Sequence, residues 1–281
     1  MLRLNVSIVL YRPNWEEVKG LTEVLLRVRR LHRVYWIDNS PIAAERLPID
    51  SPQLVYIHEG KNIGYGAGHN VAIRESVYDE IPFHLVVNSD IEVSVEGIDA
   101  MLDFMEQHSE VGSMMPRIVG LDGSVQHLCK LLPTPLDVFG RRFLPSCLMR
   151  KQNARYEMLE SGYDKMLNVP YLSGCFMLLR TEAVLKARLF DERFFMYPED
   201  IDLTRRIHRD YLTLYFPYVT VIHHHKRASY HSAKMLWIHI VNMCRYFNKW
   251  GWFVDKERHI MNKIAIESIT TIKNDKDYGI E

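Results

Sequence analysis

Residues 54–90 read LVYIHEGKNIGYGAGHNVAIRESVYDEIPFHLVVNSD, and this stretch decides the fold class. Two short apolar runs, at 54–58 and 83–87, are bounded by turn signals and are typical of buried strands. The segment VAIRES between them has helical spacing, so we expect a helix that begins near Asn70, after a flexible glycine-rich turn. A strand, a helix and a second strand in this order predict a parallel pair of strands.

The same alternation extends toward the N-terminus. The runs VSIVLY at 6–11 and RVYWIDNS at 33–40 predict two more strands. Asn14 is placed to cap a helix between them, because an asparagine side chain accepts hydrogen bonds from the free amides of a first helical turn. We therefore expect an α/β fold in which helices flank a central, mostly parallel sheet.

The second half continues this pattern less regularly. We expect a helix at 92–112, an irregular and locally basic loop excursion over the site at 120–168, a strand at 171–180, a helix capped by Thr181, and a last strand that ends in histidines. The chain divides into an α/β domain at 1–230 and a C-terminal helical appendage at 231–281.

The segment KMLWIHIVNMCRYFNKWGWF, residues 234–253, combines aromatic and basic residues in a helix-like pattern. Such a helix can lie in a membrane interface, where aromatic rings and basic side chains are favoured. The alternative is a helix that packs on the first domain or forms a homodimer contact.

The composition excludes several classes of protein. The chain has 281 residues, 47% hydrophobic and 25% charged, which fits a globular protein with a sizeable core. Basic and acidic residues number 35 each, so nucleic acid is not an expected partner. The cysteines form no C-x-x-C pair, and neither a signal peptide nor a membrane-spanning stretch is visible, so we expect a cytoplasmic protein.

Polar or glycine-rich clusters follow three of the predicted strands. Asp38 and Asn39 follow the second strand, the run at 61–70 follows the third, and Asn88 to Asp90 end the fourth. Because ligands of open α/β sheets bind at the carboxyl ends of the strands, we expect a site where these clusters converge. A carboxylate there can accept a hydrogen bond from the imide of uracil or thymine. A strand-end turn capped by Asp and Asn is an equally good interpretation.

The glycine-rich run does not match the dinucleotide fingerprint G-x-G-x-x-G, because neither Gly64 nor Gly66 as the first glycine gives the required spacing. Its backbone can still approach a ligand closely and lead into a helix N-terminus. A plain connection between a strand and a helix is the alternative.

Acidic and histidine residues supply candidates for a metal site and a base. Asp90 can hold a divalent cation together with the oxygens of a diphosphate, and the neutral imidazole of His223 can complete that site if the two strands meet. Asp200 can act as a general base. Alternatively, Glu199, Asp200 and Asp202 only complement the dipole of a helix that begins here.

Taken in order, the motifs VSIVLY, IDNS, NIGYGAGHN, VVNSD, YLSGCFMLLR, FDERFFMYPEDIDLTRRI and VIHHH resemble those of the nucleotide-sugar glycosyltransferases of family 2, in particular their rhamnosyltransferase-like branch in polysaccharide biosynthesis. The resemblance implies a GT-A fold, the fold of nucleotide-diphospho-sugar transferases. It also implies transfer of a sugar such as rhamnose, with inversion, from a dTDP- or UDP-sugar to a saccharide or lipid-linked acceptor.

The resemblance further implies roles for individual residues. Asp200 matches the catalytic base, Gly174 and Glu199 the acceptor site, and Asp90 with His223 the contacts of Mg²⁺ or Mn²⁺. The donor would be bound by Tyr11, Asp38, Asn62, Gly64, Gly68, Asn70, Asn88, Ser89 and Asp90. Asn88 departs from the family's D-x-D motif, because it replaces the first Asp and removes a negative charge near the metal.

Two other functions compete with this interpretation. A sugar-phosphate nucleotidyltransferase normally has a glycine-rich loop with Arg and Lys after its first strand, whereas this chain has YRPNWEE at 11–17. A non-catalytic sugar-nucleotide-binding protein would bind the donor without turnover. If the protein is a glycosyltransferase with a lipid-linked acceptor, we expect peripheral membrane contact through residues 234–253, on the cytoplasmic face of the inner membrane.

Overall fold

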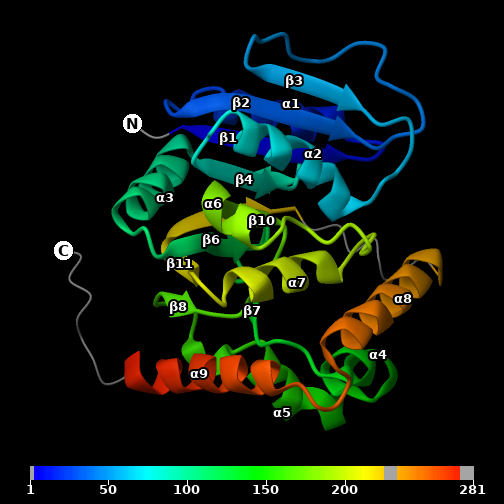
Figure 1. The fold of residues 1–281 in the computed structure, drawn as a ribbon, viewed down its shortest axis with the longest axis vertical. Coiled ribbons are helices and arrows are strands. Elements are labelled where there is room, and N and C mark those ends of the chain that lie inside the picture. The colour runs from blue at the N-terminus through cyan, green and yellow to red at the C-terminus, as the bar shows by residue number, and fades with distance from the viewer. Residues whose placement is uncertain (1–2, 225–232, 273–281) are drawn as a thin grey trace.

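The computed structural model describes residues 3–224 and 233–272, which form a large sheet covered by helices (Figure 1). The first half of the chain supplies β1 (Leu4–Leu10), α1 (Trp15–Leu25), β2 (Leu31–Asp38), β3 (Leu54–His58), α2 (Tyr65–Tyr78), β4 (Phe83–Val87), β5 (Ile91–Glu92), α3 (Val95–Gln107) and β6 (Val111–Val119). The second half supplies β7 (Cys129–Lys130), η1 (Leu136–Gly140), α4 (Arg141–Phe143), α5 (Ser146–Tyr156), η2 (Leu159–Ser161), β8 (Leu167–Asn168), β9 (Tyr171–Leu172), β10 (Phe176–Arg180), α6 (Thr181–Lys186), α7 (Pro198–Ile207), β11 (Leu212–His223), α8 (Ala233–Trp250) and α9 (Lys256–Ile272).

The large sheet has the strand order β3-β2-β1-β4-β10-β6-β11-β5, with β8 paired to β11. The strands β3, β2, β1 and β4 are mutually parallel, and β6 is parallel to β11. Between these two groups, β10 runs antiparallel to both of its neighbours. The expected α/β fold with a largely parallel sheet is confirmed, and β1, β2 and β4 end at the same edge.

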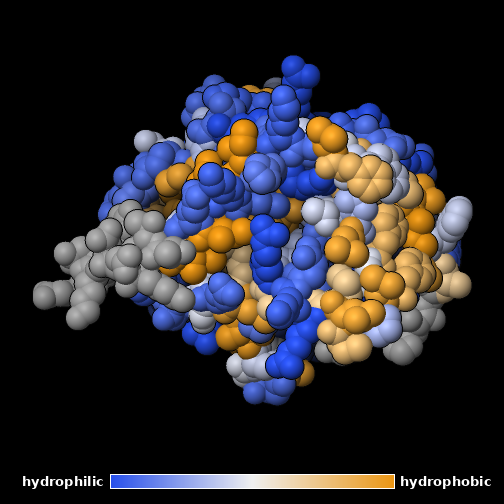
Figure 2. Space-filling view, turned by 90° about the horizontal axis from the view of Figure 1, so that it is seen from below, coloured by the Kyte–Doolittle hydropathy of each residue, from blue (hydrophilic) through white to orange (hydrophobic). Residues whose placement is uncertain are grey.

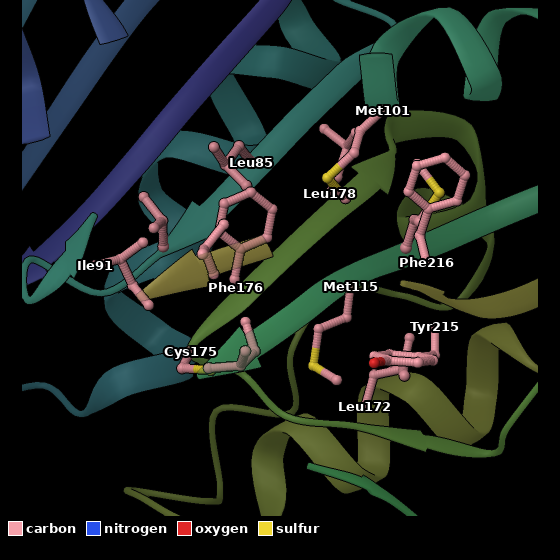
Figure 3. Close-up of a cluster of buried hydrophobic side chains, with 14 of the residues drawn as sticks. Leu85, Ile91, Met101, Met115, Leu172, Cys175, Phe176, Leu178, Tyr215 and Phe216 are labelled. Carbon is pink, nitrogen blue, oxygen red and sulfur yellow. The ribbon is translucent and has the colours of Figure 1, made fainter. Parts of the chain in front are cut away.

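Helices cover both faces of the sheet. On one face, Ile73 of α2, Val184 of α6 and Leu203 of α7 form a buried cluster with side chains of β4 and β10. Because side chains alternate along a strand, the other residues of β4 and β10 point to the opposite face, where Leu21 of α1 and Met101 of α3 join a larger cluster. Figure 3 shows part of this larger cluster, with side chains from β4, β6, β10 and β11 gathered together.

The helix α2 begins at Tyr65 and not near Asn70, so the expectation of a flexible turn through most of the glycine-rich run is wrong. Gly66 and Gly68 lie inside the helix, and a β-carbon on Gly68 would come within 2.7 Å of the Val9 side chain. The absence of side chains therefore lets α2 pack closely on β1, which is a different role from flexibility.

Two smaller expectations are corrected and one is confirmed. The strand expected at 171–180 is divided into β9 and β10 by a short turn. Thr181 is the first residue of α6 and does not cap it, and its hydroxyl donates to the Ile81 carbonyl at 2.6 Å. Asn14 caps α1 as predicted, by accepting a hydrogen bond of 3.2 Å from the Glu16 amide.

The segment 120–168 crosses the lower part of the molecule in Figure 1 as a series of short elements from β7 to β8. It is less irregular than expected, because α5 is a regular helix of 11 residues. The helix α9 lies against this segment, and the Asn262 side chain bonds to both backbone groups of Leu132 at 2.8 and 2.9 Å.

The C-terminal helices share the core of the α/β domain. Met243, Tyr246 and Phe247 of α8 and Met261 of α9 belong to the larger buried cluster. The boundary expected between residues 230 and 231 lies outside the described residues. Within the described ranges, none of the helices combines the length and the hydropathy that crossing a bilayer requires.

Buried hydrogen bonds connect β1, β4 and α2 through histidines. The Ser7 hydroxyl lies 2.7 Å from Nδ1 of His69 and 2.8 Å from Nε2 of His84, and the Ser76 hydroxyl lies 2.7 Å from Nδ1 of His84. Burial lowers the pKa of His84 to about 3 and holds the pKa of His69 well below its usual range. Both imidazoles are therefore neutral in the folded protein at neutral pH.

Arg205 of α7 joins this helix to the segment between α8 and α9. Its guanidinium donates two hydrogen bonds of 2.7 Å to Asp255, reaches Glu257 at 2.8 Å and lies 4.0 Å from the centre of the Trp250 ring. The side chains of Arg205 and Asp255 are 1% and 3% exposed. A charge buried this deeply is stable only with its partner in place.

We expect Asp255→Ala to lower the free energy of unfolding by about 3–5 kcal/mol, because it leaves the Arg205 guanidinium buried without its main partner. Urea denaturation of the variant measures this loss. The control is Glu23→Ala, which breaks an exposed pair with Lys19 on α1 and should cost less than about 1 kcal/mol. Equal losses in the two variants would contradict the role given to Asp255.

Candidate active site

Polar residues from several segments meet at the edge where β1, β2 and β4 end. The Asn39 side chain donates to the Gly64 carbonyl at 3.1 Å and to the Asn62 side chain at 3.4 Å. The backbone amide of Asn88 donates to the Cys175 carbonyl at 3.0 Å. The structure thus brings the strand-end clusters together and adds to them the turn between β9 and β10.

Tyr65, the first residue of α2, connects two of these clusters. Its hydroxyl lies 2.7 Å from the Gly174 carbonyl oxygen and 2.9 Å from Oδ1 of Asn88. A tyrosine hydroxyl has one proton, so both oxygens share it. Our reasoning from the sequence missed Tyr65, because a tyrosine between glycines gives no signal except its place in the motif.

Asp38 is buried and borders a surface hollow of about 420 Å³. Its carboxylate accepts hydrogen bonds from the Ser40 amide at 2.8 Å and from the Tyr56 hydroxyl at 2.7 Å. Each carboxylate oxygen has a second lone pair, so Asp38 can still accept a hydrogen bond from a ligand. The hollow is also lined by Arg12, Pro13, Trp15, Ser40, Pro41, Ile42, Ala43 and Ala44. Tyr11, which precedes this wall in the chain, is half exposed.

The residues of the glycine-rich run that were expected to bind the donor differ in their burial. Gly64 has a φ of +100°, and a β-carbon there would lie 2.7 Å from a backbone carbonyl of the loop before α7. Asn62 fixes this turn by accepting a hydrogen bond of 3.0 Å from the Gly64 amide. Gly68 and Asn70 are buried, and the Asn70 side chain bonds to both backbone groups of Phe190 at 2.9 and 3.0 Å. Asn62 and Gly64 lie at the edge, whereas Gly68 and Asn70 support the loop that precedes α7.

The antiparallel pairing of β5 with β11 brings Asp90 and His223 together. Oδ1 of Asp90 lies 3.5 Å from Nε2 of His223, and the Gln126 side-chain oxygen lies 3.0 Å from Nδ1 of that ring. A carboxylate and an imidazole at this spacing fit two ligands of one divalent cation. The described residues contain no group of three or more such ligands, so further ligands would come from a bound molecule. Ser89, next to Asp90, is partly exposed, and His225 lies outside the described residues.

Asp200 lies in the first turn of α7, which begins at Pro198. Oδ2 of Asp200 accepts a hydrogen bond of 2.9 Å from the Gly174 amide, and Oδ1 accepts one of 2.8 Å from the Ile201 amide. Burial raises the pKa of Asp200 to about 6, against the opposing effect of these two amides. Asp200 is therefore ionised at neutral pH and is a stronger base than an ordinary aspartate.

Glu199 is buried beside Asp200, and its Oε2 has no hydrogen-bond partner in the part of the chain that the structure describes. Burial and the neighbouring charge of Asp200 hold the pKa of Glu199 well above its usual range. Burial and the neighbouring negative charge thus favour the protonated form of the Glu199 carboxyl beside Asp200. One carboxyl can donate and the other can accept a hydrogen bond, which suits a substrate with several hydroxyl groups.

Asp202 lies two residues further along α7 and has a structural role. Its completely buried carboxylate pairs with Arg206 at 2.7 Å and Lys249 at 2.6 Å, and accepts a hydrogen bond of 2.8 Å from the Trp250 indole. These contacts tie α7 to α8. Only Glu199 and Asp200 of this acidic motif remain for chemistry.

No family model matches the chain. It is 30% identical over 240 residues to the N-acetylglucosaminyl-diphospho-decaprenol L-rhamnosyltransferase of Mycobacterium tuberculosis (strain CDC 1551 / Oshkosh), a match that covers 79% of this chain and 76% of that protein. It is 26% identical over 215 residues to the low-salt glycan biosynthesis hexosyltransferase Agl10 of Haloferax volcanii, which covers 75% of this chain and 63% of that protein.

Among solved structures, that of GalNAc-T7 with UDP, GalNAc and Mn²⁺ is similar in fold. The TM-score is 0.56 at 12% identity, and the similarity covers 79% of this chain but only 44% of that chain. At this identity the similarity supports the fold alone.

Proposed function

The chain belongs to the glycosyltransferases of the rhamnosyltransferase type and has the GT-A fold, and we propose that it transfers rhamnose, with inversion, from a dTDP- or UDP-sugar to a saccharide on a lipid diphosphate. The name of the Mycobacterium tuberculosis relative contains both L-rhamnosyl transfer and a sugar linked to a polyprenyl diphosphate, which supports this choice of sugar and acceptor. The enzyme takes part in polysaccharide synthesis.

The observation that carries the mechanism is the link between Asp200 and the donor edge. The Gly174 amide holds Asp200, and the Gly174 carbonyl is held by Tyr65, whose hydroxyl also contacts Asn88. In our proposal, the acceptor sugar lies against Gly174 and Glu199, and the donor lies on the side of Asn88. The anomeric carbon then lies between the base and the diphosphate.

In the proposed reaction, Asp200 accepts the proton of an acceptor hydroxyl as that oxygen attacks the anomeric carbon. The bond between this carbon and the diphosphate oxygen breaks in the same step, and the nucleoside diphosphate leaves with the electron pair. Attack opposite to the leaving group inverts the configuration. Glu199, which keeps its proton, donates a hydrogen bond to an acceptor hydroxyl.

We propose that Asp38 binds the pyrimidine, since its carboxylate borders a hollow of about 420 Å³ that the aromatic side chain of Trp15 also lines. Asp90 and His223 would hold Mg²⁺ or Mn²⁺, which stabilises the negative charge that develops on the departing diphosphate. Asn88 is neutral, so it adds no charge to this cation site.

The acceptor's lipid has a suitable surface on the molecule. Five exposed hydrophobic residues from η1 to α5 and from the first part of α8 form what we call the apolar face. They are between 46% and 71% exposed, and they are Leu136, Phe143, Leu144, Leu148 and Trp237. Figure 2 shows hydrophobic surface gathered on the side of the molecule where α4 and α8 lie. Basic residues belong to the same elements, namely Arg141, Arg142, Arg150, Lys151 and Lys234.

We therefore propose that the apolar face rests peripherally on the cytoplasmic surface of a membrane that contains anionic lipids. Of the membrane contact expected through residues 234–253, only the first part of α8 remains available. The second half of this helix is packed into the core through Met243, Tyr246 and Phe247. A homodimer through the same face is the alternative that the test must exclude.

Titration calorimetry with UDP, dTDP, GDP and CDP, each with Mn²⁺, Mg²⁺ or EDTA, tests the donor site. We expect dTDP or UDP to bind best, since cytosine and the purine GDP do not present the same imide to Asp38, and we expect metal to strengthen binding. Asp90→Ala should remove the metal-dependent part, and the exposed Asp122→Ala should not. Binding of none of the four nucleotides would contradict the proposal, and release of pyrophosphate on turnover would indicate a nucleotidyltransferase.

Asp200→Asn should lower kcat by roughly 100-fold or more while nucleotide binding persists, because the amide cannot accept a proton. In the unaltered enzyme kcat should fall as the pH decreases through about 6, where Asp200 becomes protonated. A radiolabelled transfer assay from pH 5 to 8 measures both effects. Full activity of Asp200→Asn would remove Asp200 from the role of base.

Vesicle sedimentation tests the apolar face. The double variant Phe143→Ser/Leu148→Ser should bind vesicles of phosphatidylcholine and phosphatidylglycerol at least about tenfold more weakly, because each lost side chain is worth about 1.5–3 kcal/mol when fully buried. The control is Tyr78→Ser, since Tyr78 is 84% exposed on α2. If the double variant instead turns a dimer into a monomer in analytical ultracentrifugation and binds vesicles normally, the face is a homodimer contact.

A further inference from the structure

Lys130 lies in an aromatic setting on the small two-stranded sheet of β7 and β9. Lys130 pairs with Tyr171 in the antiparallel register of this sheet. Its ammonium lies 5.8 Å from the centre of the Tyr171 ring and 5.8 Å from that of the Tyr156 ring. The faces of the two rings can attract the positive charge of the ammonium, but they do not accept its hydrogen bonds as an oxygen would. The N–H groups of the ammonium can therefore donate to another partner.

No carboxylate pairs with Lys130 among residues 3–224 and 233–272, and its ammonium donates no hydrogen bond there. Burial lowers the pKa of Lys130, and the nearby Arg141 lowers it further, whereas Glu157 and Asp200 raise it. The Lys130 side chain is partly exposed between the two rings, so the hydrogen-bond donors of its ammonium stay open to a bound molecule. The arrangement is suited to an anion that is absent from the protein itself.

The position of Lys130 places that anion beside the base. Lys130 and Asp200 influence each other electrostatically, and both tyrosines that contact Lys130 are affected by the charge of Asp200. The strand β9 also runs directly into the turn whose Gly174 amide holds Asp200. The ammonium therefore borders the acceptor side of the site.

A route leads from this ammonium toward the apolar face. The guanidinium of Arg141 lies 5.4 Å from the centre of the Tyr156 ring that also contacts Lys130, and it pairs with Glu157 at 2.6 Å. Arg141 begins α4, which carries Phe143 of the apolar face. Asp200, the Lys130 ammonium and the apolar face therefore lie in the same order as the sugar, the charged group and the lipid of a lipid-linked acceptor.

We propose that Lys130, framed by Tyr156 and Tyr171, binds the diphosphate that links the acceptor sugar to its lipid. This inference rests on the proposed function, and it assigns the anionic part of the acceptor to residues outside the family motifs. The ammonium supplies the charge and hydrogen bonds to a phosphate oxygen, and the tyrosine rings exclude water around it. An acceptor without this diphosphate then lacks one of its main contacts.

The experiment compares two acceptors that carry the same sugar. One is N-acetylglucosamine linked through a diphosphate to a farnesyl chain, and the other is the neutral octyl N-acetylglucosaminide. Lys130→Met should raise KM for the diphosphate acceptor at least about tenfold more than KM for the neutral one, with kcat much less affected. Lys130→Arg should restore most of the difference, and the exposed Lys19→Met is the control. Thermal melting verifies that each variant is folded.

Other outcomes overturn the proposal. Equal increases in KM for both acceptors would mean that Lys130 only supports the structure. A lower kcat with both acceptors, together with a shifted acid limb of the pH profile, would mean that it tunes Asp200 instead.

If the unaltered enzyme transfers sugar to neither acceptor, the proposed acceptor class fails, but Lys130 is still tested. Inorganic pyrophosphate is then titrated into protein whose donor site is saturated with nucleoside diphosphate. Binding that is lost in Lys130→Met and kept in Lys130→Arg supports the anion site, and identical binding by all variants contradicts it.

Discussion

The hydroxyl of Tyr65 is the contact on which the geometry of the site depends. It joins Asn88, just after β4, to Gly174, in the turn before β10, and the amide of Gly174 holds Asp200. Burial raises the pKa of Tyr65 well above its usual range, so the hydroxyl keeps its proton at any working pH. The donor side and the base are therefore positioned by each other through a single side chain, and they do not depend on separately folded loops.

The sequence predicts the strands and their polar ends well, because both leave a local signal. Apolar runs of strand length followed by polar residues locate β2 and β4, and the edge at which Asp38 and Asn88 lie follows from the parallel arrangement. The meeting of Asp90 with His223 could be suggested but not established from the sequence. It depends on the pairing of β5 with β11, two strands that lie far apart along the chain.

The remaining features depend on tertiary packing that leaves no local pattern. Gly68 resembles a loop glycine in the sequence, and only its contact with Val9 explains why a helix tolerates it. Lys130 and Tyr156 lie in a segment without periodicity, yet the pairing of β7 with β9 brings them toward Asp200. A helical appendage was expected at 231–281, but the packing of α9 did not follow from its sequence, because that sequence is polar and its few core residues join a cluster formed by other elements.

The buried histidines make the stability of the fold depend on protons. In the unfolded chain an imidazole titrates near pH 6.5, whereas folded His84 does so only near pH 3, because burial lowers its pKa. Above pH 6.5 the contribution of these histidines to stability is constant. As the pH falls below 6.5, the unfolded state binds protons that the folded state does not, so the free energy of unfolding decreases. Mild acid therefore lowers the free energy of unfolding through the buried histidines that join β1, β4 and α2.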